Sequence, residues 1–280
     1  MSTTIGHRNP RRVLQDSGLL AKKHFGQNFL VSPTMPRRIA VAGGACADDV
    51  VFEIGAGVGT LTRALAALAG RVVALEHDRE LLPLLATEMV ELPNVEVRAG
   101  NVLDVDWPAL ATELGGPPII YGNLPYHLST PILIALLEAP HAFRRACFLL
   151  QLEFAERLAA PPGHRDCGTL SAYAAVQMKT HIAFRVPPGS FHPAPRVDSA
   201  VLVLERLEAP VVDVGRPEVF RQMVRALFGQ RRKTSRKALK AVFEDAEAAL
   251  EHAGLAPERR GETFDIQELG ALSRALCVHR

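Results

Sequence analysis

Short apolar runs alternate with helical patterns along the chain as far as about residue 207. Because strands that alternate with helices usually form a mainly parallel sheet with helices on both faces, this pattern predicts a doubly wound α/β fold. The expected strands are 50–54, 71–75, 95–98, 118–121, 146–150, 181–186 and 199–204, and the expected helices between them are 33–42, 60–69, 79–89, 129–138, 151–159 and 169–179.

The last part of the chain lacks strand patterns. Pro210 and Pro217 mark the change, and helical periodicity then predicts helices at 217–228, 233–252 and 266–276. We therefore expect three parts, which are a basic, flexible N-terminal tail at 1–22, an α/β domain at 23–207 and a small all-helical domain at 208–280.

Composition excludes several classes of protein. The 280 residues are 48% hydrophobic, which is ordinary for a globular chain. No apolar run reaches the length of about eighteen residues that a membrane span needs, and the start is polar and basic, so we expect a cytoplasmic protein without a signal or anchor. The four cysteines show no C-x-x-C spacing, which predicts reduced, mostly buried thiols and no metal site.

Positive charge is concentrated in two segments although the net charge is only +2. Residues 221–240 contain eight Lys or Arg and no acidic residue. A second basic group near the start contains Arg8, Arg11, Arg12, Lys22 and Lys23. A solvated helix face would explain the first segment, but two such patches on a nearly neutral chain favour a polyanionic partner.

A glycine-rich stretch, Gly55-Ala56-Gly57-Val58-Gly59, follows the expected strand 50–54 and precedes a helix. Glycine lets a ligand approach the backbone closely. A dinucleotide-binding fingerprint would place its last glycine at Thr60, so the spacing disfavours a pyrophosphate and favours a nucleoside cofactor. By itself, the stretch would fit a simple strand-to-helix turn equally well.

Two further polar residues follow the next two expected strands. Glu76 ends one strand, where its carboxylate can accept both hydroxyls of a ribose. Asn101 follows the other strand, and its amide can bond to the edge of an adenine. Because ligands of open α/β sheets bind at the carboxyl ends of strands, we expect these residues to surround one site.

The sequence Asn123-Leu124-Pro125-Tyr126 follows the fourth expected strand. An adenine amine is a poor nucleophile, because its lone pair is delocalised into the ring. The Asn123 amide oxygen and the Leu124 carbonyl could accept its hydrogens, while Tyr126 offers a ring on which the base can stack. In isolation these residues would be an ordinary turn with Tyr126 in the core. Beside a nucleoside site they predict amine methylation.

The chain resembles, in order and along nearly its whole length, the dimethyladenosine transferases that modify small-subunit ribosomal RNA. The resemblance rests on residues 22–30, the glycine stretch 55–59, Glu76, and residues 122–126, 151–158, 191–201 and 230–234. It implies a class I, Rossmann-like, seven-stranded sheet, with S-adenosylmethionine as methyl donor. The implied product is N6,N6-dimethyladenosine at two adjacent adenines in a hairpin loop near the 3′ end of 16S ribosomal RNA.

The resemblance also implies roles for individual residues. Phe191 would close the adenine pocket opposite Tyr126, and the C-terminal domain would dock on RNA in a pre-30S particle. We expect a monomer that requires no metal. The expected donor-site residues are Asn28, Leu30, Gly55, Gly57, Glu76, Asn101 and Asn123, and the expected RNA-binding residues are Arg231, Arg232, Lys233, Arg236, Lys237 and Lys240.

Two positions depart from the family pattern, and three other functions stay open. Asn101 stands where the family usually has Asp, and Cys167 stands where it usually has Tyr. The first alternative is a large-subunit adenine N6-methyltransferase of the macrolide-resistance type. The second is a non-catalytic RNA-binding assembly factor on the same fold. The third, a nicotinamide dehydrogenase, is disfavoured by the glycine spacing.

Overall fold

The computed structural model describes residues 8–22 and 26–278, so Lys23, His24 and Phe25 of the first matching stretch lie outside the described residues. Contacts divide the chain into two compact units. The first unit comprises Met1–Ala155 and His181–Arg206, and the second comprises Glu156–Thr180 and Leu207–Arg280. Residues 156–180 are thus grouped with the C-terminal helices, whereas the sequence placed them in the α/β domain.

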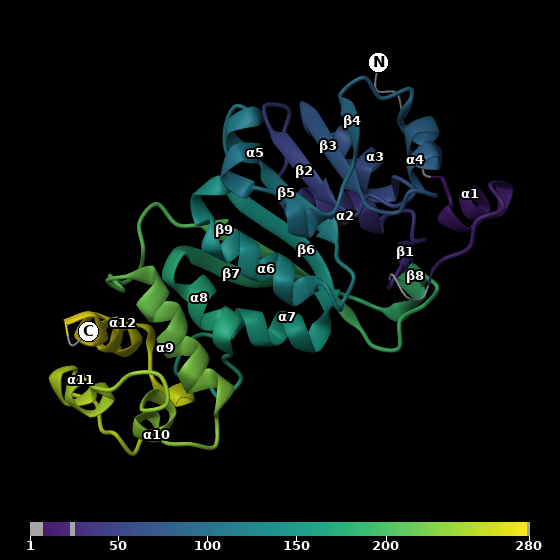
Figure 1. The fold of residues 1–280 in the computed structure, drawn as a ribbon. Coiled ribbons are helices and arrows are strands. Elements are labelled where there is room, and N and C mark those ends of the chain that lie inside the picture. The colour runs from purple at the N-terminus through teal and green to yellow at the C-terminus, as the bar shows by residue number, and fades with distance from the viewer. Residues whose placement is uncertain (1–7, 23–25, 279–280) are drawn as a thin grey trace. The chain divides into compact units, whose positions relative to one another are not determined.

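The first unit is built on a sheet of seven strands in the order β4-β3-β2-β5-β6-β9-β7 (Figure 1). Strands β2 to β6 are parallel along the sheet, and β9 is antiparallel to β6. All seven expected strands are present, which confirms the predicted sheet. They are β2 Val50–Ile54, β3 Arg71–Glu76, β4 Val95–Ala99, β5 Ile119–Asn123, β6 Arg145–Gln151, β7 Met178–Val186 and β9 Ser199–Arg206.

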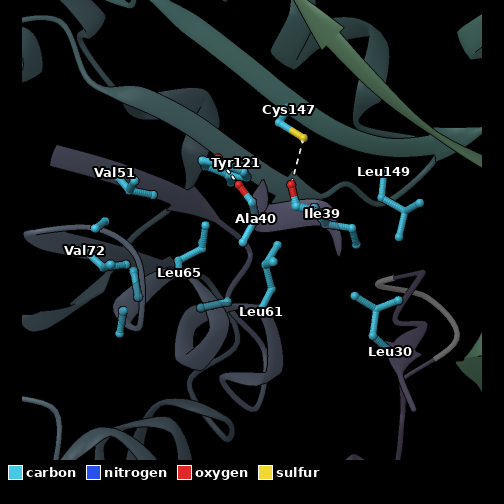
Figure 2. Close-up of a cluster of buried hydrophobic side chains, with 14 of the residues drawn as sticks. Leu30, Ile39, Ala40, Val51, Leu61, Leu65, Val72, Tyr121, Cys147 and Leu149 are labelled. Carbon is cyan, nitrogen blue, oxygen red and sulfur yellow. Dashed lines mark hydrogen bonds between the residues drawn. The ribbon is translucent and has the colours of Figure 1, made fainter. Parts of the chain in front are cut away.

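Helices cover both faces of this sheet. On one face, α2 (Met35–Ala42) and α3 (Thr60–Ala66) pack on side chains such as Val51 and Val72 (Figure 2). There the Tyr121 hydroxyl donates to the Ala40 carbonyl at 2.8 Å, and burial raises the pKa of this phenol. On the other face, Trp107 of α5 (Trp107–Glu113) meets Phe52 edge-on, with ring centroids 5.8 Å apart.

The other elements of the first unit include α4 (Leu82–Met89) and α6 (Ser129–Glu138), which were both expected. Helix α5 was not expected, and Pro108 stands in its first turn, a position at which proline fits a helix. Asp106 caps it by accepting the Ala109 amide at 3.0 Å. Short 3₁₀ turns occupy Val102–Asp104, Pro140–Ala142 and Pro188–Ser190.

Part of the expected flexible tail is a helix, α1 (Pro10–Asp16). Asn9 caps this helix by accepting the Arg11 amide at 3.0 Å. Leu14 is buried in a cluster with Phe29, Val58 and Leu81, and Arg8 pairs with the Glu88 carboxylate at 2.7 Å. Apolar burial and an ion pair thus tie part of this expected tail to the rest of the first unit.

The second unit is helical apart from the start of β7. Its helices are α8 (Thr169–Gln177), α9 (Pro217–Gly229), α10 (Ser235–Leu239), α11 (Ala246–His252) and α12 (Ile266–Val278), and a 3₁₀ turn occupies Gly261–Thr263. Helix α7 (Leu152–Ala159) begins in the first unit and ends in the second. The expected single helix 233–252 is wrong, since turns separate α10 from α11. Val242 and Phe243 are weak helix formers, and Asp245 occupies the N-cap position of α11.

Candidate functional site

A pocket opens at the carboxyl ends of the parallel strands in the first unit. It lies where the strand order reverses, between β2 and β5, which is where open α/β sheets bind ligands. The strand ends and residues 26–30 form its wall. Nine expected residues line it, namely Asn28, Leu30, Gly55, Gly57, Glu76, Asn101, Asn123, Leu124 and Tyr126.

The glycine stretch forms one wall of this pocket with bare backbone. Gly55, Gly57 and Gly59 all have positive φ, at 71°, 60° and 80°, a region in which side chains are strained. A Cβ at Gly57 would lie 3.0 Å from the Phe29 ring, whereas a Cβ at Gly55 would meet nothing within 4 Å. Gly57 is therefore needed for close packing, and Gly55 leaves open space beside the backbone for a ligand.

The Glu76 carboxylate is fixed by backbone amides although it is only 7% exposed. One oxygen accepts from the Gly57 amide at 2.7 Å, and the other accepts from the His77 amide at 2.8 Å and the Asp78 amide at 2.7 Å. A carboxylate offers about four acceptor positions, so capacity remains for a ligand hydroxyl. This rigid acceptor suits the ribose of a nucleoside.

Asn101 holds the turn that follows β4. Its side-chain oxygen accepts the Leu103 amide at 3.1 Å and caps the 3₁₀ turn. An aspartate could make the same cap, since only an acceptor oxygen is used. The Asn-for-Asp departure therefore preserves the turn while it removes a negative charge from the pocket wall.

The Asn123 amide is oriented by the segment that carries Asn28. Its Nδ2 donates to the Asn28 main-chain carbonyl at 2.7 Å. The amide oxygen is consequently the end that is left to accept hydrogens from a ligand amine. Leu124 is buried beside it, and its main-chain amide donates to the Leu149 carbonyl at 3.2 Å. These bonds hold the turn 123–126 at the end of β5.

The two aromatic residues that the resemblance places around an adenine lie in different surroundings. Tyr126 lines the pocket and is half-buried, and burial raises the pKa of its phenol, so the group is neutral near pH 7. Phe191 is 2% exposed and belongs to the core cluster, and its strand β8 (Phe191–His192) pairs with β1 (Phe29–Leu30). Phe191 does not line the described pocket, so its role against the adenine stays a prediction.

A charged cluster at the edge of the pocket joins residues before β1 to the end of β3. Lys22 contacts the Asp78 carboxylate at 2.8 Å and Glu80 at 3.0 Å, and Gln27 donates to Asp78 at 2.9 Å. Burial alone would raise the pKa of Asp78, but the bonds from Lys22 and Gln27 outweigh it and lower that pKa. Sequence reasoning missed this cluster, because nothing in the pattern joins residue 22 to residue 78.

Glu53 is a pocket residue that sequence reasoning also missed. It is 2% exposed, and it accepts from the Thr62 hydroxyl at 2.6 Å. Burial, aided by the nearby Glu76 charge, raises its pKa from 4.5 to about 8, although the Thr62 bond opposes the shift. The available signal was an acidic residue inside the otherwise apolar strand 50–54.

We expect Glu53→Gln to change how stability depends on pH. In the unfolded chain Glu53 ionises near pH 4.5, and in the folded protein near pH 8, so between these values folding takes up a proton. This group alone therefore makes the free energy of unfolding fall as pH rises, by about 1.4 kcal/mol per unit. Gln cannot ionise, so the variant should gain stability relative to wild type between about pH 5 and pH 8. Melting curves test this, and a pH-independent difference would refute it.

The six expected RNA-binding residues all lie in the second unit, but not on one helix face. Helix α10 spans only Ser235–Leu239, so Arg231, Arg232 and Lys233 precede it and Lys240 follows it. Arg236 pairs with Glu247 at 3.3 Å, although no acid stands near it in the sequence. Arg232, Lys233, Lys237 and Lys240 are exposed on the turns and α10.

A hydrogen bond joins the side chain of Arg231 to the main chain of Cys167 within the second unit. The Arg231 guanidinium donates to the Arg165 carbonyl at 2.9 Å and also to the Cys167 carbonyl. Arg231 thus braces the loop that contains Cys167. The Cys167 side chain is buried, which raises the pKa of its thiol to about 11. Cys147 is also buried, but Cys46 is exposed, so the expectation of mostly buried thiols holds for only part of the set.

Residues 8–22 and 26–278 show neither a metal-binding cluster nor a membrane-spanning helix. These residues contain no group of three or more His, Cys, Asp or Glu side chains arranged to hold a metal ion. Within the same ranges, none of the helices has the length and apolar character that crossing a membrane requires.

The strand order, the antiparallel β9 and a nucleoside-type pocket at the strand ends define a class I S-adenosylmethionine-dependent methyltransferase. A sequence model of the ribosomal RNA adenine dimethylase family matches residues 18–270, and the chain belongs to this family. S-adenosylmethionine is therefore the methyl donor. The open backbone at Gly55 and the fixed carboxylate of Glu76 fit its nucleoside part.

Similar proteins agree with this assignment. The chain is 43% identical over 280 residues to ribosomal RNA small subunit methyltransferase A of Anaeromyxobacter dehalogenans, covering 96% of this chain and 98% of the relative. A dimethyladenosine transferase from Plasmodium falciparum has a similar structure, with a TM-score of 0.75, 25% identity, and coverage of 87% of this chain and 95% of that one. The 23S rRNA methyltransferase ErmE follows with a TM-score of 0.68, 27% identity, and coverage of 89% and 100%.

Proposed function

We propose that this protein transfers methyl groups from S-adenosylmethionine to the N6 amines of two adjacent adenines near the 3′ end of 16S ribosomal RNA. The product is N6,N6-dimethyladenosine, and the role is in assembly of the small ribosomal subunit. The observation that carries the proposal is the Asn123 amide, whose oxygen is set as an acceptor by the 2.7 Å bond to Asn28 at the wall of the donor pocket. The family and the names of its members supply the choice of RNA.

The residues at this site would act on the target amine by hydrogen bonding and alignment. The bound donor supplies an electrophilic methyl group on a sulfonium sulfur. The Asn123 oxygen and the Leu124 carbonyl accept the two N6 hydrogens and draw the nitrogen toward tetrahedral geometry, while Tyr126 stacks on the base. Good alignment contributes about 7–11 kcal/mol to such reactions. The amine loses a proton only after it has become cationic, so no strong base is required.

Glu76 and the glycine stretch would hold the donor. Glu76 accepts the ribose hydroxyls, and Gly55 and Gly57 allow the backbone to approach. Asn101 would bond to the adenine of the donor, and Asn28 and Leu30 would close the wall on the other side. The expected substrate is a pre-30S particle in the cytoplasm, and the protein acts as a monomer.

Methylation of unmethylated small subunits tests this function. The protein is incubated with labelled S-adenosylmethionine and the particles, and the modified nucleosides are then mapped. Two adjacent dimethyladenosines in the 3′ hairpin loop are expected. Label in large-subunit RNA would instead favour an activity like that of ErmE, and particle binding without label would indicate a non-catalytic assembly factor.

RNA docking is proposed for the exposed basic residues of the second unit, with Arg232, Lys237 and Lys240 at its centre. Each phosphate contact that is lost should flatten the logarithmic salt dependence of binding by about 0.7–0.9. We therefore expect replacement of these three residues by Gln to weaken subunit binding and to reduce the slope by about two to three units. Affinity for the donor should not change, since the donor pocket lies in the first unit.

Arg236→Gln is the matched control for this experiment. Its guanidinium is already paired with Glu247, so it should contribute less to the salt slope than any member of the triple variant. A triple variant with the salt dependence of wild type would show that the RNA docks elsewhere, with the basic group that begins at Arg8 as the next candidate.

A further inference from the structure

The Tyr126 hydroxyl is bonded to a residue in a distant strand. Its oxygen lies 3.0 Å from the Ser199 hydroxyl, although the two residues are 73 positions apart. Tyr126 follows β5, and Ser199 begins β9, which lies on the far side of β6 in the sheet. The phenol therefore reaches past the end of β6 to its partner. No sequence pattern joins these residues, although each belongs to one of the stretches that define the family resemblance.

Ser199 is held rigidly by its own strand. It is fully buried, at 0% exposure, and it is paired in register with Gln151 at the end of β6. The preceding carbonyl, that of Asp198, accepts the Leu152 amide at 2.9 Å, so the start of β9 is fixed on both sides of the serine. The Ser199 hydroxyl is thus a stationary anchor, whereas Tyr126 is a pocket residue that a ligand can touch.

We propose that Ser199 is a positioning residue for methyl transfer, which fixes the position of the Tyr126 ring on which the target adenine stacks. This inference rests on the function proposed above. The staggered rotamers about the first torsion of a tyrosine place its ring in quite different positions. Anchoring the hydroxyl selects one of these positions, so the base meets a stacking surface that is already in place. A residue that holds a substrate-contacting side chain in place is often as important for the reaction as that side chain itself.

The Ser199 bond also explains why this position carries a tyrosine and not a phenylalanine. A phenylalanine would stack on an adenine equally well, because stacking uses only the ring. The hydroxyl adds a bond to Ser199, and the half-buried phenol needs such a partner in order not to lose a hydrogen bond on leaving water. The Ser199 hydroxyl therefore fixes where the Tyr126 ring lies and also gives the half-buried phenol a hydrogen-bond partner.

A double-mutant cycle tests the proposal. Ser199→Ala, Tyr126→Phe and the double variant are compared in single-turnover methylation of unmethylated small subunits. Each single change should lower the rate constant by about tenfold, the value of one net hydrogen bond. The double variant should also lose about tenfold and not a hundredfold, because both changes remove the same bond. Donor affinity, measured by calorimetry, should stay as in wild type.

Ser273→Ala is the matched control. Ser273 is also fully buried and donates to the Val214 carbonyl at 2.6 Å, but it lies in the second unit. It should lower the melting temperature without changing the methylation rate. If Ser199→Ala retained the wild-type rate, or if the two single losses multiplied in the double variant, the proposal would be overturned. Tyr126→Phe provides the same test from the other side of the bond if Ser199→Ala does not fold.

Tyr126→Ala separates this inference from the proposed function. It should depress methylation far more than Tyr126→Phe, since it removes the stacking ring. If Tyr126→Ala methylated at the normal rate, the adenine site itself would be misplaced. If only Ser199→Ala and Tyr126→Phe were normal, the adenine site would stand and the positioning role of Ser199 would fall.

Discussion

Asn123→Ala should nearly abolish methyl transfer, with a single-turnover rate constant lower by about 10²–10³-fold, the usual effect of removing one hydrogen-bonding group from a transition state. The reason is geometric, because the bond to Asn28 leaves the amide oxygen of Asn123 as the acceptor for the adenine amine. Alanine removes that acceptor. Single-turnover methylation of unmethylated subunits at saturating donor measures the effect, so that a change in donor affinity does not enter the rate constant.

Asn94→Ala is the matched control for this variant. The Asn94 amide also donates to main-chain carbonyls, those of Ala66 and Ala69, at 2.9 and 3.0 Å, but it lies away from the pocket. It should cost stability and leave the rate unchanged. Normal methylation by Asn123→Ala would mean that the amine is held by other groups, and the proposed mechanism would then be wrong.

Glu76→Ala should weaken binding of S-adenosylmethionine by about 10- to 150-fold. A hydrogen bond to a charged group contributes about 1.5–3 kcal/mol, and the buried carboxylate of Glu76 would accept the ribose hydroxyls. The variant also leaves the amides of Gly57, His77 and Asp78 without their acceptor. Isothermal calorimetry with the donor measures the change in affinity.

Two further variants separate ligand binding from folding at this position. Glu76→Gln keeps one acceptor oxygen and the shape of the side chain, so it should lose less affinity than Glu76→Ala. Glu80→Ala, near the same strand end, removes an exposed carboxylate that pairs with Lys22 and should leave donor affinity almost unchanged. Unaltered affinity in Glu76→Ala would refute the assignment of this residue to the ribose.

The α/β architecture was predictable because the inner strands of its sheet are buried on both faces and therefore appear as short apolar runs. Strands such as Val50–Ile54 match their predicted bounds, and the pocket residues follow from the rule that parallel strands end at one edge. The break after Leu239 was not predictable from periodicity, since Leu239, Phe243 and Leu250 keep helical spacing across the turn.

Hydrogen bonds between residues that are distant in sequence could not be predicted either. The bonds of Tyr126 to Ser199 and of Asn123 to Asn28 depend on strand order, which no local pattern encodes. The partners of the charged residues in the basic segment 221–240 were equally unpredictable. Arg236 had no acid within its own stretch, but folding brings Glu247 to it, and Arg231 turns out to bond to main-chain carbonyls.

The pairing of β1 with β8 has a consequence for how the protein is made on the ribosome. Phe29 and Leu30 emerge early in synthesis, whereas their partners Phe191 and His192 emerge only after most of the sheet. Contacts between such distant parts of a chain form late, since closing a long loop costs entropy that local contacts do not. Leu30, a wall of the donor pocket, therefore gains its strand partner only once both ends of the first unit exist. In a nascent chain that stops before β8, the contacts of Phe29 with Val58 and Leu81 would hold this wall without the strand pairing, so we expect such a chain to bind the donor more weakly than the whole protein.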